Sequence, residues 1–355
     1  MDDFYAARSR TIPPLAWSNI APPFSALPFP ARAAEAMAEE PALEPEFEIV
    51  DPHFHLRDFS DSEASGERYL AQDFRDDIAR SGHRITGSVF IECGIMYDAE
   101  GEDAVRSLGE TRYVGELAQA HRKSGLASGI VAKVDLTRTE DLDALLAHHE
   151  EAGRGHLRGV RNSIATASFP PLSGIHNDPK LLQDPSLRAG ITLLGRKGLV
   201  FESWLFHPQM DELAYLAKAC PATTIVLEHL GCPLGLGPYA GKLDTTFAEW
   251  RPAMARLAQC PNVVAKIGGL GPFMGQMAGP ETSSVSLARD WKPWIETAIE
   301  LFGPQRCMFE SNWPANRPAS TYGQIWNAFK LATRGLSQSE RAALFSSTAR
   351  SIYRI

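Results

Sequence analysis

The sequence predicts an α/β fold, a (β/α)₈ TIM barrel preceded by an N-terminal proline-rich arm. The length of 355 residues suits one large α/β barrel or two ordinary domains. Short β-branched or aromatic runs alternate with segments of helical spacing along most of the chain. Such alternation requires right-handed crossovers and a parallel sheet, and eight units over roughly 300 residues fit a closed barrel. We therefore expect the arm at residues 1–45 and the barrel at residues 46–355.

The eight expected strands follow one another in chain order as short apolar runs. They lie at residues 47–55, 86–94, 127–135, 157–163, 198–206, 223–231, 262–270 and 306–312. Helical spacing is found at residues 111–125, 140–153, 207–220, 247–260, 321–335 and 337–355. A doubly wound open sheet is the alternative, but no GxGxxG follows any strand. Long aperiodic stretches at residues 162–180, 231–245 and 268–290 are expected to be loops that wall a substrate site.

The first 45 residues differ from the rest of the chain. Residues 11–30 combine many prolines with bulky apolar side chains, which suits an extended arm on a surface. Residues 31–46 are expected to form a short helix and a linker. Trp17, Phe24 and Phe29 suggest that the arm packs on its own barrel or on a neighbouring subunit, which favours a homodimer.

The composition excludes several classes of function. The net charge of −8 is not offset by a basic stripe, which argues against nucleic-acid binding. No apolar run is long enough to span a bilayer, and the acidic N-terminus lacks a secretory signal. Five scattered cysteines without a CxxC pair indicate neither a disulfide framework nor a thiolate zinc site. We therefore expect a cytoplasmic protein that acts on a small molecule.

Polar residues gather where the expected strands end, which is where barrels carry their catalytic groups. His53 and His55 alternate along an extended chain and so share a face, and we expect Asp51 on that face and Val50 on the other. Two imidazoles on one face suit one metal ion or one substrate oxygen. The other strands end in further polar residues, namely Glu92, Arg161, Glu202, His229, Lys266, Glu310 and Asn312.

Three motifs in order resemble the amidohydrolase superfamily: HxH at 53–55, EHLG at 228–231 and MFESNWP at 308–314. The resemblance covers about residues 47–355. It is nearest to the amidohydrolase 2 group of predicted metal-dependent TIM-barrel hydrolases. That group includes L-fuconolactonase, 4-sulfomuconolactone hydrolase and 2-pyrone-4,6-dicarboxylate lactonase. The resemblance implies metal-binding positions at His53, His55 and His229.

The chain departs from this family pattern at three places, and the first is the end of the fifth expected strand, which lacks the histidine ligand that several members of the superfamily keep there. Asn312 stands where the family generally has an aspartate that moves protons. The lysine that bridges two metals in some members has no counterpart, and Arg161 lies in that region. The resemblance therefore implies a mononuclear site rather than a binuclear one.

The asparagine leaves three readings of the mechanism, because an amide cannot act as a general base. In the first, Glu310, Glu202 or Glu92 supplies the missing carboxylate, unless Glu310 or Glu202 forms a buried ion pair with Lys266 or Arg161. In the second, no metal is bound, the histidines polarise the carbonyl and Arg161 grips a substrate carboxylate. In the third, the barrel binds a ligand without catalysis.

We predict a hydrolase that opens a lactone or related ester by attack of water on a carbonyl. The carbonyl would be polarised by the histidine cluster or by a single zinc or manganese ion. Asn312 would orient water or substrate, and Arg161 and Lys266 would contact a substrate carboxylate or oxyanion. His207, just beyond the fifth strand, would contact substrate, substitute for the missing histidine ligand or cap a helix, and Trp313 would wall the pocket or pack in the barrel. The alternative enzyme is a metal-dependent decarboxylase of the same superfamily that acts on an aromatic acid.

Overall fold

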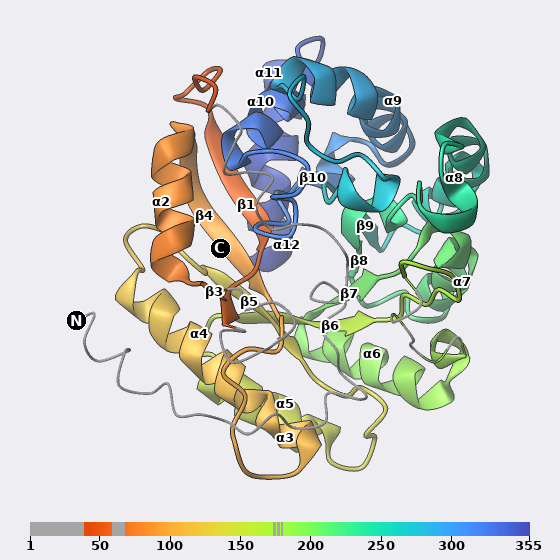
Figure 1. Ribbon diagram of the computed structural model, residues 1–355. Helices are drawn as coiled ribbons and strands as arrows, with labels where there is room; N and C mark the ends of the chain where they lie inside the picture. Colours follow the sequence, from red (N-terminus) through yellow and green to blue (C-terminus); the bar gives the residue numbers. More distant parts are fainter. Residues whose placement is uncertain (1–38, 59–67, 173–174, 176–177, 179) are drawn as a thin grey trace.

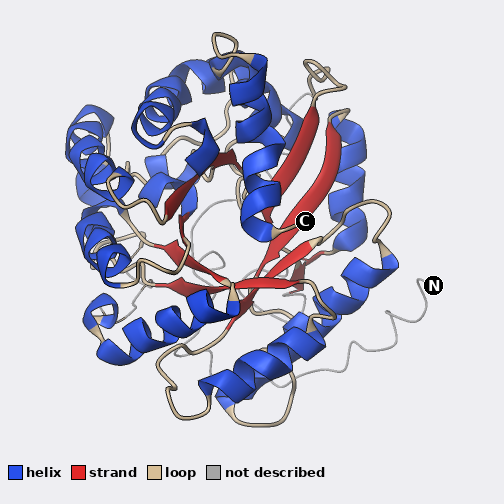
Figure 2. Ribbon diagram, turned by 180° about the vertical axis from the view of Figure 1, so that it is seen from behind, coloured by secondary structure: helices blue, strands red, loops and turns tan. Residues whose placement is uncertain are grey.

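The computed structural model describes residues 39–58, 68–172, 175, 178 and 180–355. Eight parallel strands form a ring that helices surround (Figures 1 and 2). They pair in chain order: β1 (Glu48–Phe54), β4 (Arg84–Ile91), β5 (Gly129–Lys133), β6 (Leu157–Ser163), β7 (Val200–Trp204), β8 (Ile225–Leu227), β9 (Val263–Ile267) and β10 (Cys307–Phe309). The ring closes between β1 and β10. Just beyond the ends of these two strands, the His55 N–H donates to the carbonyl of Trp313 at 2.7 Å. The expected barrel of eight parallel strands is confirmed.

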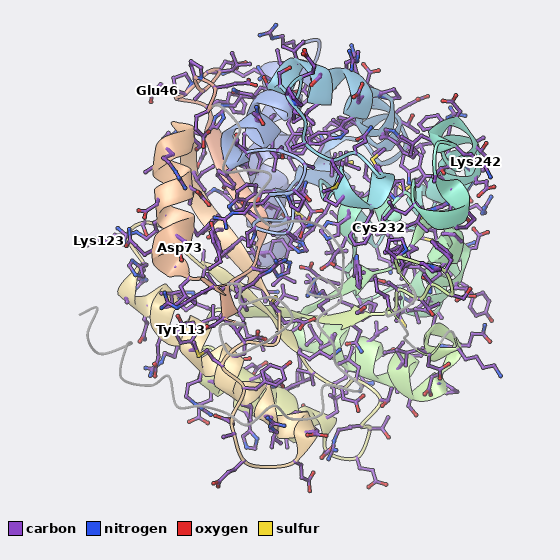
Figure 3. The ribbon with its side chains drawn as sticks, viewed as in Figure 1. Glu46, Asp73, Tyr113, Lys123, Cys232 and Lys242 are labelled. Carbon is purple, nitrogen blue, oxygen red and sulfur yellow. The ribbon has the colours of Figure 1, made fainter. Side chains whose placement is uncertain are left out.

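Helices cover the outside of the ring, as Figure 2 shows. They are α2 (Ala71–Ser81), α3 (Asp103–Arg106), α4 (Leu108–Ala120), α5 (Leu142–Ala152), α6 (Pro185–Lys197), α7 (Met210–Ala219), α8 (Leu243–Ala258), α9 (Ser284–Phe302), α10 (Tyr322–Ala332), α11 (Gln338–Ala342) and α12 (Thr348–Tyr353). A two-stranded sheet joins β2 (Arg57–Asp58) to β3 (Arg68–Tyr69). Exposed side chains such as Lys123 and Lys242 lie at the periphery, whereas Cys232 is buried beside the ring (Figure 3). Within the described ranges, every helix is too short or too polar to cross a membrane.

Two expectations concern the chain outside the ring. The first needs correction, and the second concerns residues that for the most part lie outside those the structure describes. The stretch 268–290 is not a loop throughout, because α9 begins at Ser284, where the Ser283 hydroxyl accepts from the N–H of Ser286. Most of the expected arm, including its bulky residues Trp17, Phe24 and Phe29, lies outside the described residues. Residues 39–46 are described and contain no helix.

The alternation of side chains along β1 is interrupted by an irregularity. Its pairing with β4 shifts register after Asp51, next to Pro52, which has no N–H to donate. Val50 therefore faces the barrel interior, while the Asp51 carboxylate turns outward and accepts from the Tyr322 hydroxyl of α10 at 3.0 Å. The expectation that Asp51 shares the face of His53 is wrong, because an extra residue in a strand reverses the alternation.

An apolar layer forms the floor of the barrel, and a charged layer lies directly on it. The floor also includes Tyr353, which comes from α12 and is fully buried. Two residues further along a strand, the side chain faces the same way. Glu202, Glu228, Lys266 and Glu310 each follow a floor residue by two positions and so point into the barrel. The floor residues of the strands are Val50, Val89, Ile91, Val131, Val200, Val226, Val264 and Met308.

Candidate active site

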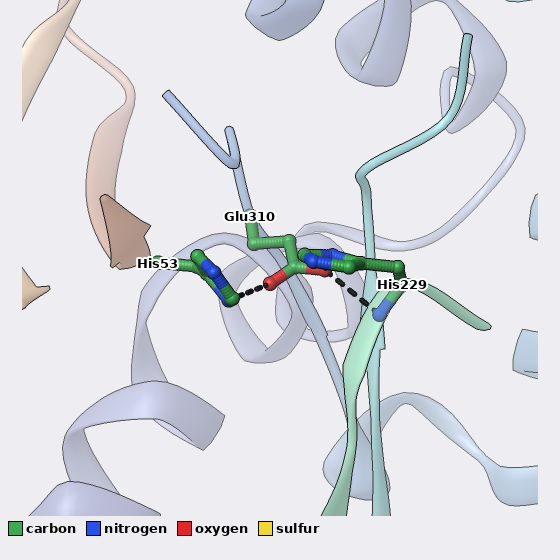
Figure 4. A group of neighbouring side chains, drawn as sticks. All are labelled: His53, His229 and Glu310. Atoms are coloured by element: carbon green, nitrogen blue, oxygen red, sulfur yellow. Dashed lines mark hydrogen bonds and ion pairs between the residues drawn. The ribbon is translucent and has the colours of Figure 1, made fainter. Parts of the chain in front are cut away.

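One carboxylate connects two histidines that come from distant parts of the chain (Figure 4). Glu310 follows β10, His53 lies in β1, and His229 lies in a single turn after β8. His53 Nδ1 lies 2.8 Å from Glu310 Oε2, and His229 Nδ1 lies 2.6 Å from Oε1. The backbone N–H of His229 also donates to Oε1 at 3.1 Å. All three side chains are at most 1% exposed, so Glu310 fixes the orientation of both rings in the barrel interior.

These contacts determine which ring nitrogen of His229 carries the proton. An ionised carboxylate only accepts hydrogen bonds, so the hydrogen bond to Glu310 Oε1 places a proton on Nδ1 of His229. His53 Nδ1 lies between Glu310 Oε2, at 2.8 Å, and Lys266 Nζ, at 3.3 Å, and Lys266 also donates to Glu202 at 2.6 Å. The Nε2 atom of His229 is therefore left with a free lone pair, whereas Nε2 of His53 meets His55.

The backbone around His229 departs from the strand predicted at residues 223–231. β8 ends at Leu227, and His229 adopts a left-handed conformation with φ of 54°. Two glycines after β9 leave room for the pair. A Cβ on Gly269 would lie 2.4 Å from His229 Cγ, and one on Gly268 would lie 2.4 Å from Glu310 Cγ. The tight contact of His229 and Glu310 therefore depends on two missing side chains.

Replacing Gly269 with alanine is expected to displace the His229 ring from Glu310. Gly269 has a φ of +61°, so the added methyl group combines backbone strain with a clash. We expect the free energy of unfolding to fall by about 1–3 kcal/mol and divalent-metal affinity to fall with it. Urea denaturation and metal titration measure the two effects. Gly279→Ala is the control, since its Cβ would meet no atom within 4 Å. Equal results for the two variants would contradict the proposed role of Gly269.

The two histidines of the HxH pair meet at their Nε2 atoms. His53 Nε2 lies 3.0 Å from His55 Nε2, and His55 Nδ1 lies 2.9 Å from the carbonyl of Ile91, which requires a proton on that Nδ1. Burial lowers the pKa of both histidines well below the ordinary value, with Lys266 adding to the effect at His53 and Arg161 at His55. Both imidazole rings are therefore uncharged.

A metal cation fits this arrangement. Ligand nitrogens about 2.0–2.1 Å from a tetrahedral zinc ion lie about 3.3 Å from one another, close to the observed His53–His55 separation. His229 Nε2 is buried and has no hydrogen-bond partner among the described residues. Histidines that ligate metals usually donate their other N–H to a carboxylate or a backbone carbonyl, as His55 does to Ile91 and His229 to Glu310, while His53 Nδ1 approaches Glu310 Oε2.

Two groups of metal-ligating side chains lie close together in the described part of the chain. In each, one donor atom per residue lies within 4.8 Å of the others. The first group is His53, His229 and Glu310, and the second is His53, Glu202 and Glu228. Two of the three predicted metal ligands, His53 and His229, belong to the first group. The third, His55, is not a member of that group but contacts His53.

Arg161 and Lys266 form ion pairs inside the barrel. Arg161 Nε donates to Glu92 Oε1 at 2.9 Å, and its Nη1 donates to Glu228 Oε2 at 3.4 Å. Burial acts to lower the pKa of Arg161, but attraction to Glu92 and Glu228 outweighs it and raises that pKa. Lys266 pairs with Glu202. The ion pair considered for Glu202 and Lys266 is present, whereas Arg161 pairs with Glu92 and Glu228 rather than with Glu202 or Glu310.

Asn312 lies beside this cluster in a left-handed conformation with φ of 51°. Its amide nitrogen donates to Asn316 Oδ1 at 3.3 Å. Its Oδ1 is buried and has no hydrogen-bond partner among the described residues. The amide therefore presents an acceptor for a water or a substrate hydroxyl, which suits an orienting role.

Two residues predicted to contact substrate, His207 and Trp313, have hydrogen-bond partners within the protein. His207 Nδ1 accepts from the backbone N–H of Leu234 at 3.3 Å, and its ring packs edge-on against Tyr239. Trp313 Nε1 donates to Asp77 of α2 at 2.7 Å. His207 thus supports the loop after β8, and Trp313 packs between the barrel and α2.

Sequence reasoning missed two members of the interior network. The sequence pattern pointed to His229 as a site residue but not to its neighbour Glu228. Glu228 nevertheless follows Val226 by two residues, which places it on the inner face of the barrel. Burial raises the pKa of Glu228 well above the ordinary value, and the nearby Glu202 contributes to the increase. The Tyr353 hydroxyl donates to Glu202 at 2.5 Å. No sequence signal marks Tyr353, because it lies about 150 residues from its partner.

Comparisons with known proteins agree with this architecture. A family model described as amidohydrolase matches residues 50–355. A Sinorhizobium fredii protein named uncharacterized protein y4mH is 34% identical over 324 residues, covering 86% of this chain and 98% of that protein. An L-fucono-1,5-lactonase of Burkholderia multivorans is 30% identical over 217 residues, covering 60% of this chain and 69% of that protein. A solved structure of a Burkholderia multivorans amidohydrolase with bound zinc has a TM-score of 0.67 at 24% identity, covering 87% of this chain and 100% of that one. At that identity the likeness supports the fold.

Proposed function

Because this chain belongs to the amidohydrolase family, we propose that it is a metal-dependent hydrolase that opens a lactone. The observation that carries the proposal is the Glu310 carboxylate, which lies against Nδ1 of both His53 and His229 and leaves Nε2 of His229 without a partner among the described residues. The facing Nε2 atoms of His53 and His55, 3.0 Å apart, add to this support. Three imidazoles suit a catalytic zinc or manganese ion that keeps an open position.

His53, His55 and His229 would hold the ion, and Glu310 would position His53 and His229 from behind. When bound, such an ion polarises a carbonyl and lowers the pKa of a water molecule. Asn312 offers its free Oδ1 to the water or to a substrate hydroxyl and so orients the attack. Neutral histidines are ready to ligate without first losing a proton, which agrees with the lowered pKa values of His53 and His55.

A proton acceptor is still required, because Asn312 is not a base. Glu202, Glu228 and Glu310 are completely buried, and Glu202 and Glu310 have both oxygens in contact with other side chains. Glu92 is 9% exposed, and Arg161 holds its Oε1. We assign proton acceptance to Glu92, since it is the most accessible of the four carboxylates.

The lactone class is supported by the named relative. The L-fucono-1,5-lactonase of Burkholderia multivorans aligns with 60% of this chain. A cyclic ester of a sugar acid carries hydroxyl groups that the Asn312 amide oxygen and the Glu92 carboxylate can accept. We propose a small sugar-acid lactone as the substrate.

The proposal is tested by adding a panel of five- and six-membered sugar lactones to the full chain and following acid release. The enzyme is assayed as purified, after dialysis against a chelator, and after addition of Zn²⁺ or Mn²⁺. We expect activity that falls at least about 100-fold on metal removal and returns on addition. His229→Ala should abolish it. Turnover that persists in metal-free protein would remove the metal from the mechanism, and a panel without any turnover would remove the lactone.

A further inference from the structure

The second group of metal-ligating side chains lies against the barrel floor, one layer below the facing Nε2 atoms. His53, Glu202 and Glu228 offer donor atoms within 4.8 Å of one another, and all three are completely buried. Glu228 Oε1 lies 3.9 Å from His53 Nδ1 and has no hydrogen-bond partner in the described residues. An unpaired buried carboxyl oxygen of this kind calls for a cation or a proton.

A cation from the chain itself reaches into this group. Lys266 Nζ donates to Glu202 Oε2 at 2.6 Å and lies 3.3 Å from His53 Nδ1. Lys266 is completely buried, because β9 points it inward two residues after Val264 of the floor. Its charge also acts on Glu228, where it lowers the pKa against the larger effect of burial. The ammonium group thus contacts two members of the group and acts electrostatically on the third.

The C-terminal helix holds this cation in place. The Tyr353 hydroxyl donates to the other oxygen of Glu202 at 2.5 Å. The Tyr353 ring also lies 5.4 Å from Lys266 Nζ, within the range of a cation–π contact. Both oxygens of Glu202 are therefore used, and Lys266 has little freedom to leave.

We propose that Lys266 is a built-in cation that fills a potential second metal site and so limits the chain to one divalent ion. A divalent ion between Glu202 and Glu228 would lie within a few ångströms of the ammonium group, and two cations at that separation in a buried site repel strongly. Removing the ammonium would release one oxygen of Glu202 beside the unpartnered Oε1 of Glu228, and carboxylate oxygens are ligands that zinc and manganese both accept. The inference rests on the proposed function for the first ion only.

The test compares the number of bound ions in the wild type and in Lys266→Met, which keeps the length of the side chain and removes its charge. Each protein is saturated with Zn²⁺ or with Mn²⁺, desalted and assayed by elemental analysis. We expect one more ion per chain in the variant, and a larger rise in Tm on adding metal than in the wild type. Tyr353→Phe is the matched control, since it removes a hydrogen bond from the same carboxylate but keeps the ammonium, and it should retain the wild-type count. The double variant Glu202→Gln with Lys266→Met should lose the extra ion.

Each outcome decides between the proposals. An unchanged ion count in Lys266→Met, or two ions in the wild type, would overturn the role of Lys266. A variant that folds only in metal-supplemented medium supports it, whereas one that fails to fold with and without metal overturns it. No ion in the wild type and one in the variant would disprove the metal in the proposed function while leaving this inference standing.

Discussion

The substitution Glu310→Gln is expected to lower divalent-metal affinity by about 10- to 100-fold, the usual effect of losing a group that orients a metal ligand. The Glu310 carboxylate accepts at one oxygen from His229 and approaches His53 with the other. A glutamine has one acceptor oxygen, so its NH₂ group would face the N–H of one ring. That ring must move its proton to Nε2, which removes the lone pair that a metal needs.

The measurement is a calorimetric titration of metal-free Glu310→Gln with Zn²⁺, together with lactone turnover, which should fall at least as much as the affinity. Glu110→Gln is the control. Glu110 is buried in α4 and accepts from three backbone N–H groups, and burial raises its pKa to about 8, so a neutral side chain is a close substitute at pH 7. Wild-type affinity in Glu310→Gln would show that the carboxylate does not orient the histidines.

Replacing Arg161 with methionine is expected to reduce the free energy of unfolding by about 3–5 kcal/mol, the range found when one partner of a buried ion pair is removed. Arg161 is 7% exposed and is held by the side chain and the carbonyl of Glu92 and by Glu228. Without it, two carboxyl groups lose their nearest cation. Glu228 should then hold its proton more firmly, because the Arg161 charge now acts to lower its pKa.

Urea denaturation of the single variants Arg161→Met and Glu92→Gln and of their combination checks this expectation. The second substitution should restore part of the lost stability, giving a coupling energy of about 0.5–3 kcal/mol. A loss below about 1 kcal/mol in Arg161→Met, with a raised KM only for acidic substrates, would contradict this. It would favour the alternative in which Arg161 grips a substrate carboxylate.

The alternation of apolar runs and helical segments was enough to predict the eight-stranded ring, because βαβ units have one favourable handedness and close in chain order. The same rule predicted that His53, His229 and Glu310 approach one another, since strand ends of a barrel meet at one rim. Local irregularities were not predictable. The register shift beside Pro52 and the left-handed turn at His229 depend on contacts with β4 and with Glu310.

The sequence by itself determined the barrel, the three histidines with their family resemblance, and the loss of the usual aspartate at Asn312. Only the tertiary structure decided what each buried charge contacts. Glu310 faces two imidazoles, whereas Glu202 faces Lys266 and Tyr353. The sequence could not assign these partners, because each carboxylate looks alike in an apolar run. Their roles follow from which oppositely charged or hydrogen-bonding group the closed ring brings within about 3 Å.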